Sequence, residues 1–131
     1  MRRILVVEDS ASTRSFIRSA LESGGALGPC DIVEAASGFD ALRLLPRGLY
    51  DLVITDINMP DINGLELVAF IRKSDRHRST AIVIVSTQAS EKDRVRGMSL
   101  GADEYLAKPL SAETLLATVD RLLSGRPTAS G

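Results

Sequence analysis

Residues 51–60 read DLVITDINMP, a short apolar run that leads directly into a polar turn. The run from Leu52 to Thr55 shows no polar alternation, which is typical of a strand buried on both faces of a parallel sheet. Asp56 ends the run, and the residues after it are good turn formers. The stretch therefore predicts a buried strand that places an aspartate at the edge of a sheet.

The same alternation of apolar runs and polar connections continues along the chain. Four further short runs predict strands, at residues 4–7, 32–34, 82–86 and 105–108. Longer stretches with helical spacing lie between the runs, at residues 16–21, 41–45, 67–71, 90–100 and 111–123. Five strands alternating with five helices predict an α/β fold, a doubly wound five-stranded parallel sheet flanked by five helices.

Two of the predicted helices differ in how firmly they are anchored. The first carries an apolar stripe made of Phe16, Ile17, Ala20 and Leu21. The fourth, residues 90–100, is mostly polar, with Val95, Met98 and Leu100 as its only large apolar anchors. A helix with so few apolar contacts has low local stability and shifts easily.

Length and composition predict one globular domain. The chain has 131 residues, of which 44% are hydrophobic and 25% charged. We expect the domain over residues 1–124 and a flexible tail at 125–131, which is rich in Gly, Pro and Ser. Cys30 is the only cysteine, which excludes an internal disulfide and is compatible with the cytoplasm.

Charge and hydropathy limit the classes of partner. A net charge of -1 creates no field that would attract nucleic acid or an anionic membrane. No apolar run is long enough to cross a bilayer, so membrane insertion is not expected. Recognition of a partner must therefore depend on a local surface.

Polar side chains stand at the ends of four predicted strands: Glu8, Asp9, Asp56, Ser86, Thr87 and Lys108. Right-handed crossovers bring these ends to one edge of the sheet. Two carboxylates about 4 Å apart repel by roughly 4 kcal/mol at an effective dielectric constant near 20, so such a group needs a counter-charge. Mg²⁺ prefers carboxylates, water and a phosphate oxygen, and the chain has no His or Cys cluster for zinc. The edge therefore predicts Mg²⁺ and a phosphorylated species.

In this combination the chain resembles the receiver domains of two-component signalling, and their CheY-like, single-domain members in particular. The matching residues are Glu8, Asp9, Asp56, Asn58, Met59, Pro60, Gly64, Ser86, Tyr105, Lys108 and Pro109, and the resemblance covers residues 3–123. The resemblance, rather than the apolar pattern, implies a flavodoxin-like strand order and suggests a cis peptide bond before Pro109.

The resemblance implies a role for each residue at the predicted edge. Asp56 would take a phosphoryl group from a phosphohistidine of a sensor histidine kinase. The implied ligands of Mg²⁺ are the side chains of Asp9 and Asp56, the backbone carbonyl of Asn58 and, as a helper, Glu8. Lys108 and Ser86 would each hold a phosphoryl oxygen, which is the positioning and charge that phosphoryl transfer requires.

The resemblance also implies that phosphorylation changes a second surface, away from Asp56. Ser86 would move toward the phosphoryl group and Tyr105 would turn into the vacated space, changing the surface of the fourth helix, fifth strand and fifth helix. A downstream protein target would read that surface. The resemblance also implies that Thr87, Asn58 and Gln88 are neighbours of the phosphate pocket. Thr87 stands where the family often has alanine and would narrow access to the pocket, and Asn58 and Gln88 stand where members of the family tune the phosphoryl lifetime.

Other functions fit the residues less well. A phosphorelay intermediate, or a degenerate receiver that binds protein without phosphate, would use the same fold. An aspartate-nucleophile phosphatase needs a second aspartate two residues after the first, where this chain has Asn58. A flavin-binding module needs a phosphate cradle, which the loops of this chain do not offer, and the three carboxylates would repel a flavin phosphate. We therefore expect a stand-alone response regulator of the cytoplasm, in chemotaxis or another pathway, that is not an enzyme. His77 is expected to be a solvated loop residue remote from the site.

Overall fold

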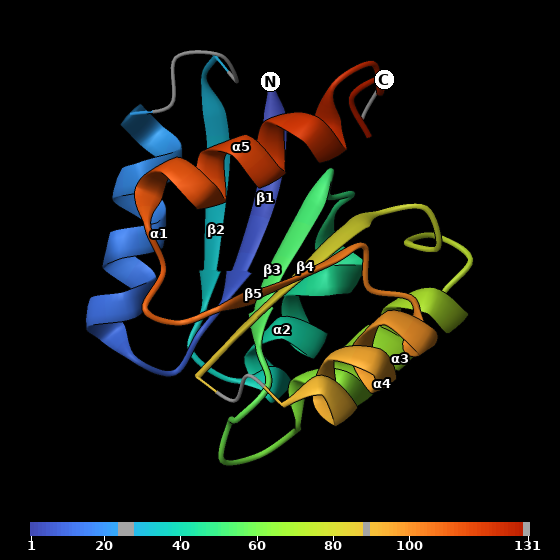
Figure 1. The fold of residues 1–131 in the computed structure, drawn as a ribbon. Helices are drawn as coiled ribbons and strands as arrows, with labels where there is room; N and C mark the ends of the chain where they lie inside the picture. The colour runs from blue at the N-terminus through green and yellow to red at the C-terminus, as the bar shows by residue number, and fades with distance from the viewer. Residues whose placement is uncertain (24–27, 88–89, 130–131) are drawn as a thin grey trace.

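The computed structural model describes residues 1–23, 28–87 and 90–129, which form a three-layer α/β sandwich (Figure 1). One parallel sheet contains β1 Arg2–Val7, β2 Cys30–Ala35, β3 Leu52–Asp56, β4 Ala81–Ser86 and β5 Glu104–Ala107. The strand order is β2-β1-β3-β4-β5. The predicted five-stranded, doubly wound fold is confirmed, with the flavodoxin-like order that the resemblance implied.

Helices cover both faces of the sheet. They are α1 Ala11–Ser23, α2 Gly38–Leu44 with the short 3-10 helix η2 Leu45–Arg47, α3 Gly64–Lys73, α4 Glu91–Leu100 and α5 Ala112–Leu123. Helices α1 and α5 lie on one face, and α2, α3 and α4 lie on the other (Figure 1). Within β1, Ile4 and Val6 belong to the core under α1 and α5, and Leu5 and Val7 to the opposite core. Two buried faces explain the unbroken apolar run.

The register of the sheet aligns the carboxyl ends of the central strands. Val7 pairs with Thr55, Asp56 pairs with Val85, and Ser86 pairs with Ala107. Residues that follow these strands therefore emerge at one edge, at the bottom of the molecule in Figure 1. The chain termini lie at the opposite edge.

The elements are confirmed, but several boundaries differ from the predicted ones, among them those of β1, which begins at Arg2, and β5, which ends at Ala107. Strand β2 begins at Cys30 and ends at Ala35, because both ends pair with β1. After α2 the chain continues through Pro46 as η2, where a proline in the first turn leaves no hydrogen bond unmade. The predicted cap of the last helix is present, since the Ser111 side chain accepts from the Thr114 N–H.

Two predicted anchors are wrong. Phe16 is 41% exposed, because the buried side of α1 is set by Ile17, Ala20 and Leu21. Val95 is 54% exposed, and within the described residues Gly97 is the one buried position of α4. Helix α4 is thus held to the fold even more weakly than its sequence predicted.

The expectation that His77 is solvated is also wrong. Its side chain is buried, with 3% exposed, and Nε2 lies 2.9 Å from the carbonyl oxygen of Leu45 in η2. The loop between α3 and β4 folds back under η2, a long-range contact that local polarity does not reveal. Nδ1 is buried and has no hydrogen-bond partner in the described part of the chain.

Burial of His77 predicts a pH dependence of stability. Burial lowers the pKa of this imidazole, the hydrogen bond to Leu45 opposes that effect, and the charge of Arg76 adds to it. A base with a lowered folded pKa stabilises the fold above its unfolded pKa of about 6.5, and this stability is lost as pH falls toward the folded value. Urea unfolding from pH 7.5 to 5 should therefore show a steeper loss in wild type than in His77→Gln, whose amide keeps a donor for Leu45. Parallel pH profiles would contradict this account.

The segment after α5, predicted to be a flexible tail, makes specific contacts as far as Ala129. The Arg2 guanidinium donates to the carbonyl oxygen of Leu123 at the end of α5 and to those of Arg126 and Pro127 in this segment. The Ala129 N–H donates to Asp51 Oδ1 at 2.7 Å. These bonds hold residues 124–129 across the amino-terminal edge of the sheet. Within the described residues, no helix has the length and apolarity needed to cross a membrane.

Candidate functional site

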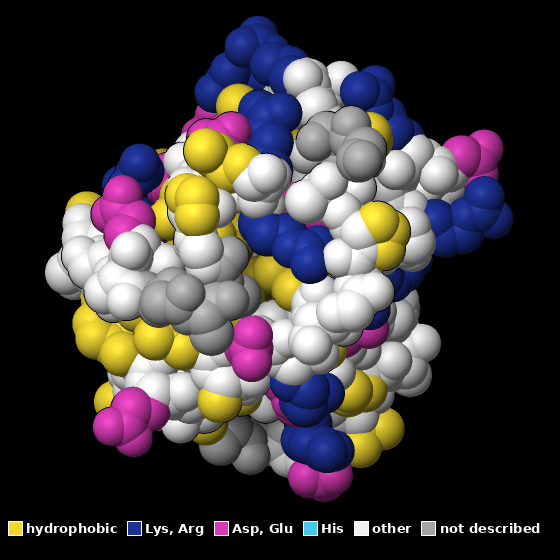
Figure 2. Space-filling model, turned by 90° about the horizontal axis from the view of Figure 1, so that it is seen from above, with side chains coloured by type: hydrophobic (Ala, Val, Ile, Leu, Met, Phe, Trp, Pro, Cys, Tyr) yellow, Lys and Arg dark blue, Asp and Glu magenta, His cyan; other side chains and the backbone are white. Residues whose placement is uncertain are grey.

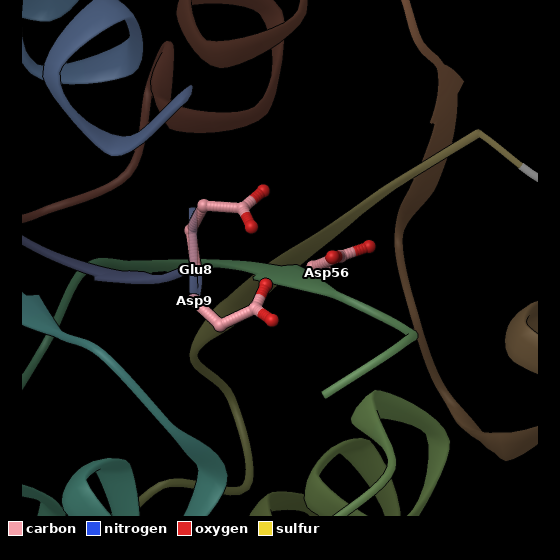
Figure 3. A group of neighbouring side chains, drawn as sticks. All are labelled: Glu8, Asp9 and Asp56. Atoms are coloured by element: carbon pink, nitrogen blue, oxygen red, sulfur yellow. The ribbon is translucent and has the colours of Figure 1, made fainter. Parts of the chain in front are cut away.

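Three carboxylates converge at the carboxyl-terminal edge of the sheet. Glu8 and Asp9 follow β1 and Asp56 ends β3, and one oxygen of each lies within 4.8 Å of the other two. Figure 3 shows the Glu8 and Asp9 side chains extending toward the side on which Asp56 lies. Glu8 and Asp56 are buried, whereas Asp9 is exposed, so the cluster is open to solvent on one side. An open group of hard oxygen donors fits a cation such as Mg²⁺ that keeps some of its water.

Within the described residues, Lys108 is the cation that pairs with this cluster. Its Nζ lies 2.7 Å from Glu8 Oε1 and 3.5 Å from Asp56 Oδ2, and the side chain is 15% exposed. With all groups ionised, three carboxylates and one ammonium leave a net charge of about -2 at the edge. A divalent cation balances that charge, so the donor set fits Mg²⁺.

Both partners of the Lys108–Glu8 ion pair have shifted pKa values. Burial raises the pKa of Glu8, against the opposing hydrogen bonds from Lys108 and the Ser10 N–H. Burial alone would lower the pKa of Lys108, but the hydrogen bond to Glu8 and the attraction of Asp56 outweigh it, so the pKa is raised. Lys108 therefore stays an ammonium at neutral pH.

Glu8 is committed to two donors. Oε1 accepts from Lys108, and Oε2 accepts from the Ser10 N–H at 3.1 Å. The sequence implied that Glu8 assists the metal, and it did not anticipate this second attachment. The longer side chain reaches back to hold Lys108 at the edge of the sheet, a contact that spacing along the chain cannot show.

The loop after β3 positions Asp56 through a close backbone approach at Gly64. The Gly64 N–H donates to the carbonyl of Ile57 at 2.8 Å. A Cβ built on Gly64 would lie 2.1 Å from the carbonyl oxygen of Asp56, which is impossible without movement of the backbone. Glycine is therefore required at this position by the path of the chain that carries Asp56.

Asp61 ties the same loop to α2. Its carboxylate accepts from the N–H groups of Gly38 and Phe39 at the start of that helix, at 3.1 and 2.8 Å. The bond from Phe39 is the largest of the causes that lower the pKa of Asp61 to about 2. The sequence pattern does not single out Asp61, because its partners lie more than twenty positions away.

Comparison with known proteins identifies the family. Residues 4–120 match the family model of the response regulator receiver domain. The chain belongs to this family. The CheY4 chemotaxis response regulator of Vibrio cholerae has a structure similar to this receiver domain, with a TM-score of 0.85, 33% identity, and coverage of 94% of this chain and 99% of that one.

Relatives of this receiver domain include chains of its own length and longer ones. Protein PilH of Pseudomonas aeruginosa is 34% identical over 125 residues, which is 95% of this chain and 100% of PilH. A probable transcriptional regulatory protein of Picosynechococcus is 41% identical over 128 residues, 92% of this chain but 49% of the relative. The receiver domain thus spans about half of that longer protein.

Four further predicted site residues of the receiver domain are Ser86, Asn58, Thr87 and Gln88. Ser86 is buried at the end of β4, and its carbonyl accepts from the Lys108 N–H at 2.8 Å. The peptide bond between Lys108 and Pro109 is cis, as the resemblance suggested. Asn58 and Thr87 are exposed. Gln88 lies outside the described residues.

Tyr105, the predicted switch residue, lies in β5 next to α4. It is half-buried against the core under α2, α3 and α4. A Cβ built on Gly97 would lie 3.7 Å from Tyr105 Cδ2, so the ring is close to the one described position of α4 that is buried. Movement of the Tyr105 side chain would therefore change its packing against α4 directly.

Proposed function

We propose that this receiver domain is a stand-alone response regulator that accepts a phosphoryl group on Asp56 from a sensor histidine kinase, with Mg²⁺ as cofactor. The observation that carries the proposal is the convergence of Glu8, Asp9 and Asp56 beside Lys108. Family membership supports the phosphoacceptor role. The match to PilH over its full length supports the stand-alone form.

In the proposed reaction, a carboxylate oxygen of Asp56 attacks the phosphorus of a phosphohistidine. A new O–P bond forms as the N–P bond breaks, and the imidazole of the kinase leaves with the electron pair and takes up a proton. Asp9, Asp56 and the backbone carbonyl of Asn58 would hold Mg²⁺, assisted by Glu8. The cation supplies positive charge for the phosphoryl oxygens.

Two further side chains act on the transferred group in this proposal. The Lys108 ammonium, 3.5 Å from Asp56 Oδ2, is near enough to turn to a phosphoryl oxygen once Asp56 carries one. The Ser86 hydroxyl would donate to a second oxygen. The domain would thus assist its own phosphorylation and dephosphorylation rather than turn over a separate substrate.

The output surface in this proposal is formed by α4, β5 and α5. Displacement of Ser86 toward the phosphoryl group would let Tyr105 turn inward and shift α4, which has little buried surface to resist movement. The partner that recognises this surface would be a protein, since the chain carries a net charge of -1 and no basic field for nucleic acid. The resemblance to CheY4 supports a chemotaxis-type pathway, and the kinase partnership supports a cytoplasmic location.

Binding of Mg²⁺ should stabilise the fold saturably. At a Mg²⁺ concentration tenfold above its Kd, the free energy of unfolding should rise by about 1.4 kcal/mol. Asp9→Asn should lose most of this gain, because it removes the exposed carboxylate of the cluster. Asp75→Asn, which changes an exposed carboxylate at the opposite edge of the sheet, is the matched control and should keep the gain. Urea unfolding with and without Mg²⁺ measures the effect. If millimolar Mg²⁺ left the free energy of unfolding of the wild type unchanged, the metal site would be refuted.

A further inference from the structure

A second pocket lies at the amino-terminal edge of the sheet, opposite the carboxylate cluster. Its volume is about 680 Å³, and it is enclosed by the starts of β3, β4 and β5 and by the segment after α5. The charged residues of its lining are Asp51, Arg72, Arg76, Arg78, Asp103 and Arg126. None of them takes part in the proposed phosphoryl transfer.

Both carboxylates of the lining are already paired with an arginine and hydrogen-bonded to a backbone N–H. Asp51 lies 3.5 Å from the Arg2 guanidinium and accepts from the Arg3 N–H at 2.8 Å. Asp103 lies 3.0 Å from Arg72 and accepts from the Ile82 N–H at 2.8 Å. These two carboxylates therefore leave the pocket little negative charge of their own.

Arg72 is part of the wall rather than a free cation. Its Nε donates to the carbonyl of Gly101, and its Nη1 donates to the carbonyls of Arg78 and Thr80. Together with the ion pair to Asp103, these bonds occupy every nitrogen of the guanidinium. Arg72 thus joins α3 to the residues just before β4 and β5 and forms part of the pocket wall.

Three arginines of the lining retain exposed positive charge. Arg76 is exposed and has no ion pair within the described residues. Among the described residues, the Arg126 guanidinium donates only to the carbonyl of Ser79, at 3.3 Å. Arg78 pairs with Asp75, but both side chains are more than half exposed, so this pair is weak. Figure 2, which looks onto this edge, shows Lys and Arg side chains covering more of the face than Asp and Glu.

We propose that this pocket binds a phosphorylated small molecule that carries at least two negative charges. Arg76, Arg78 and Arg126 would hold its phosphoryl oxygens, because guanidinium groups match phosphate geometry with paired N–H donors. Ser79 and Thr128 bring hydroxyl groups to the same lining, and Leu49 adds an apolar side chain for an organic part. The volume lies within the range of small-molecule sites.

Occupation of the pocket would connect two segments that the phosphoacceptor site does not touch. Arg76 and Arg78 lie in the loop between α3 and β4, and Arg126 lies in the segment after α5. An anion held by all three would fasten that segment to the sheet. The pocket would then report a metabolite independently of the phosphorylation of Asp56.

Titration with inorganic pyrophosphate tests the proposal. The full chain is titrated by isothermal calorimetry at low ionic strength with EDTA, which removes the metal that the carboxylate cluster would use. Wild type should bind one equivalent saturably, and Arg76→Gln and Arg126→Gln should each weaken the affinity about tenfold. Arg94→Gln, which changes an exposed arginine in the first turn of α4, is the control and should bind as wild type does. Amide shifts in NMR spectra should be largest at Ser79, Thr80 and Thr128.

Three outcomes would overturn the proposal. Wild type could show no saturable binding, or Arg94→Gln could weaken it as much as the lining variants, which would mean diffuse charge attraction. The doubly substituted Arg76→Gln/Arg126→Gln chain could bind as wild type while Lys108→Gln does not, which would place the anion at the phosphoacceptor site. Circular dichroism melts confirm that each variant is folded before it is titrated.

Discussion

Replacement of Lys108 by alanine should lower the free energy of unfolding by about 3 kcal/mol at neutral pH without Mg²⁺. Glu8 has 1% of its surface exposed and would lose Lys108, the one cation that pairs with its carboxylate within the described residues, at 2.7 Å. Asp56 would lose the same neighbour. Protonation of Glu8, whose pKa burial already raises, limits the loss. Urea denaturation followed by circular dichroism measures the change.

The control for this variant is Lys92→Ala, which removes an exposed lysine of α4 and should change stability by less than about 0.5 kcal/mol. Mg²⁺ should restore part of the stability lost in Lys108→Ala, because the cation then neutralises the carboxylates. A loss no greater than that of Lys92→Ala would show that Lys108 does not balance the cluster.

Replacement of Gly64 by alanine should destabilise the fold by about 3 kcal/mol and displace Asp56. The added Cβ would lie 2.1 Å from the Asp56 carbonyl oxygen and 2.9 Å from the Cα of Ile57, both backbone atoms that cannot turn away as a side chain does. The backbone carrying the phosphoacceptor must shift instead. Urea unfolding and Mg²⁺ titration of the variant report the two effects.

Gly97→Ala separates this effect from a general cost of replacing glycine. Its Cβ would meet the end of the Ile84 side chain at 2.8 Å, which can rotate, and alanine is favoured over glycine inside a helix by about 1 kcal/mol. Its stability should therefore stay within about 1 kcal/mol of wild type. If Gly64→Ala were as stable as Gly97→Ala, the close approach at Asp56 would not constrain the site.

The apolar pattern predicted the alternation of strands and helices because a parallel strand can be recognised from its own residues, whereas the strand order was implied by the family resemblance. An unbroken apolar run such as Leu52–Thr55 reflects burial on two faces, and the residue after the run marks the edge of the sheet. Right-handed crossover connections then bring the carboxyl ends of these strands to one edge of the sheet. For this reason Glu8, Asp9, Asp56 and Lys108 could be placed together before any coordinates were known.

Contacts between distant segments could not be predicted in the same way. Polar neighbours made His77 resemble a solvated residue, yet its position under η2 depends on how the loop after α3 folds back. The attachment of Asp61 to the start of α2 depends on the distance between two loops. Phe16 differs from its neighbours on α1 only by rotation about the helix, which apolar spacing resolves coarsely.

The most direct test of the central claim is the intact mass of the chain after incubation with acetyl phosphate and Mg²⁺, with Asp56→Asn treated in parallel. The proposed mechanism predicts that wild type gains one phosphoryl group, about 80 Da, that is labile to base and absent when EDTA removes the metal. Asp56→Asn should gain none. An adduct of the same mass on Asp56→Asn, or no adduct on a wild type that binds Mg²⁺, would contradict the assignment of Asp56 as the phosphoacceptor.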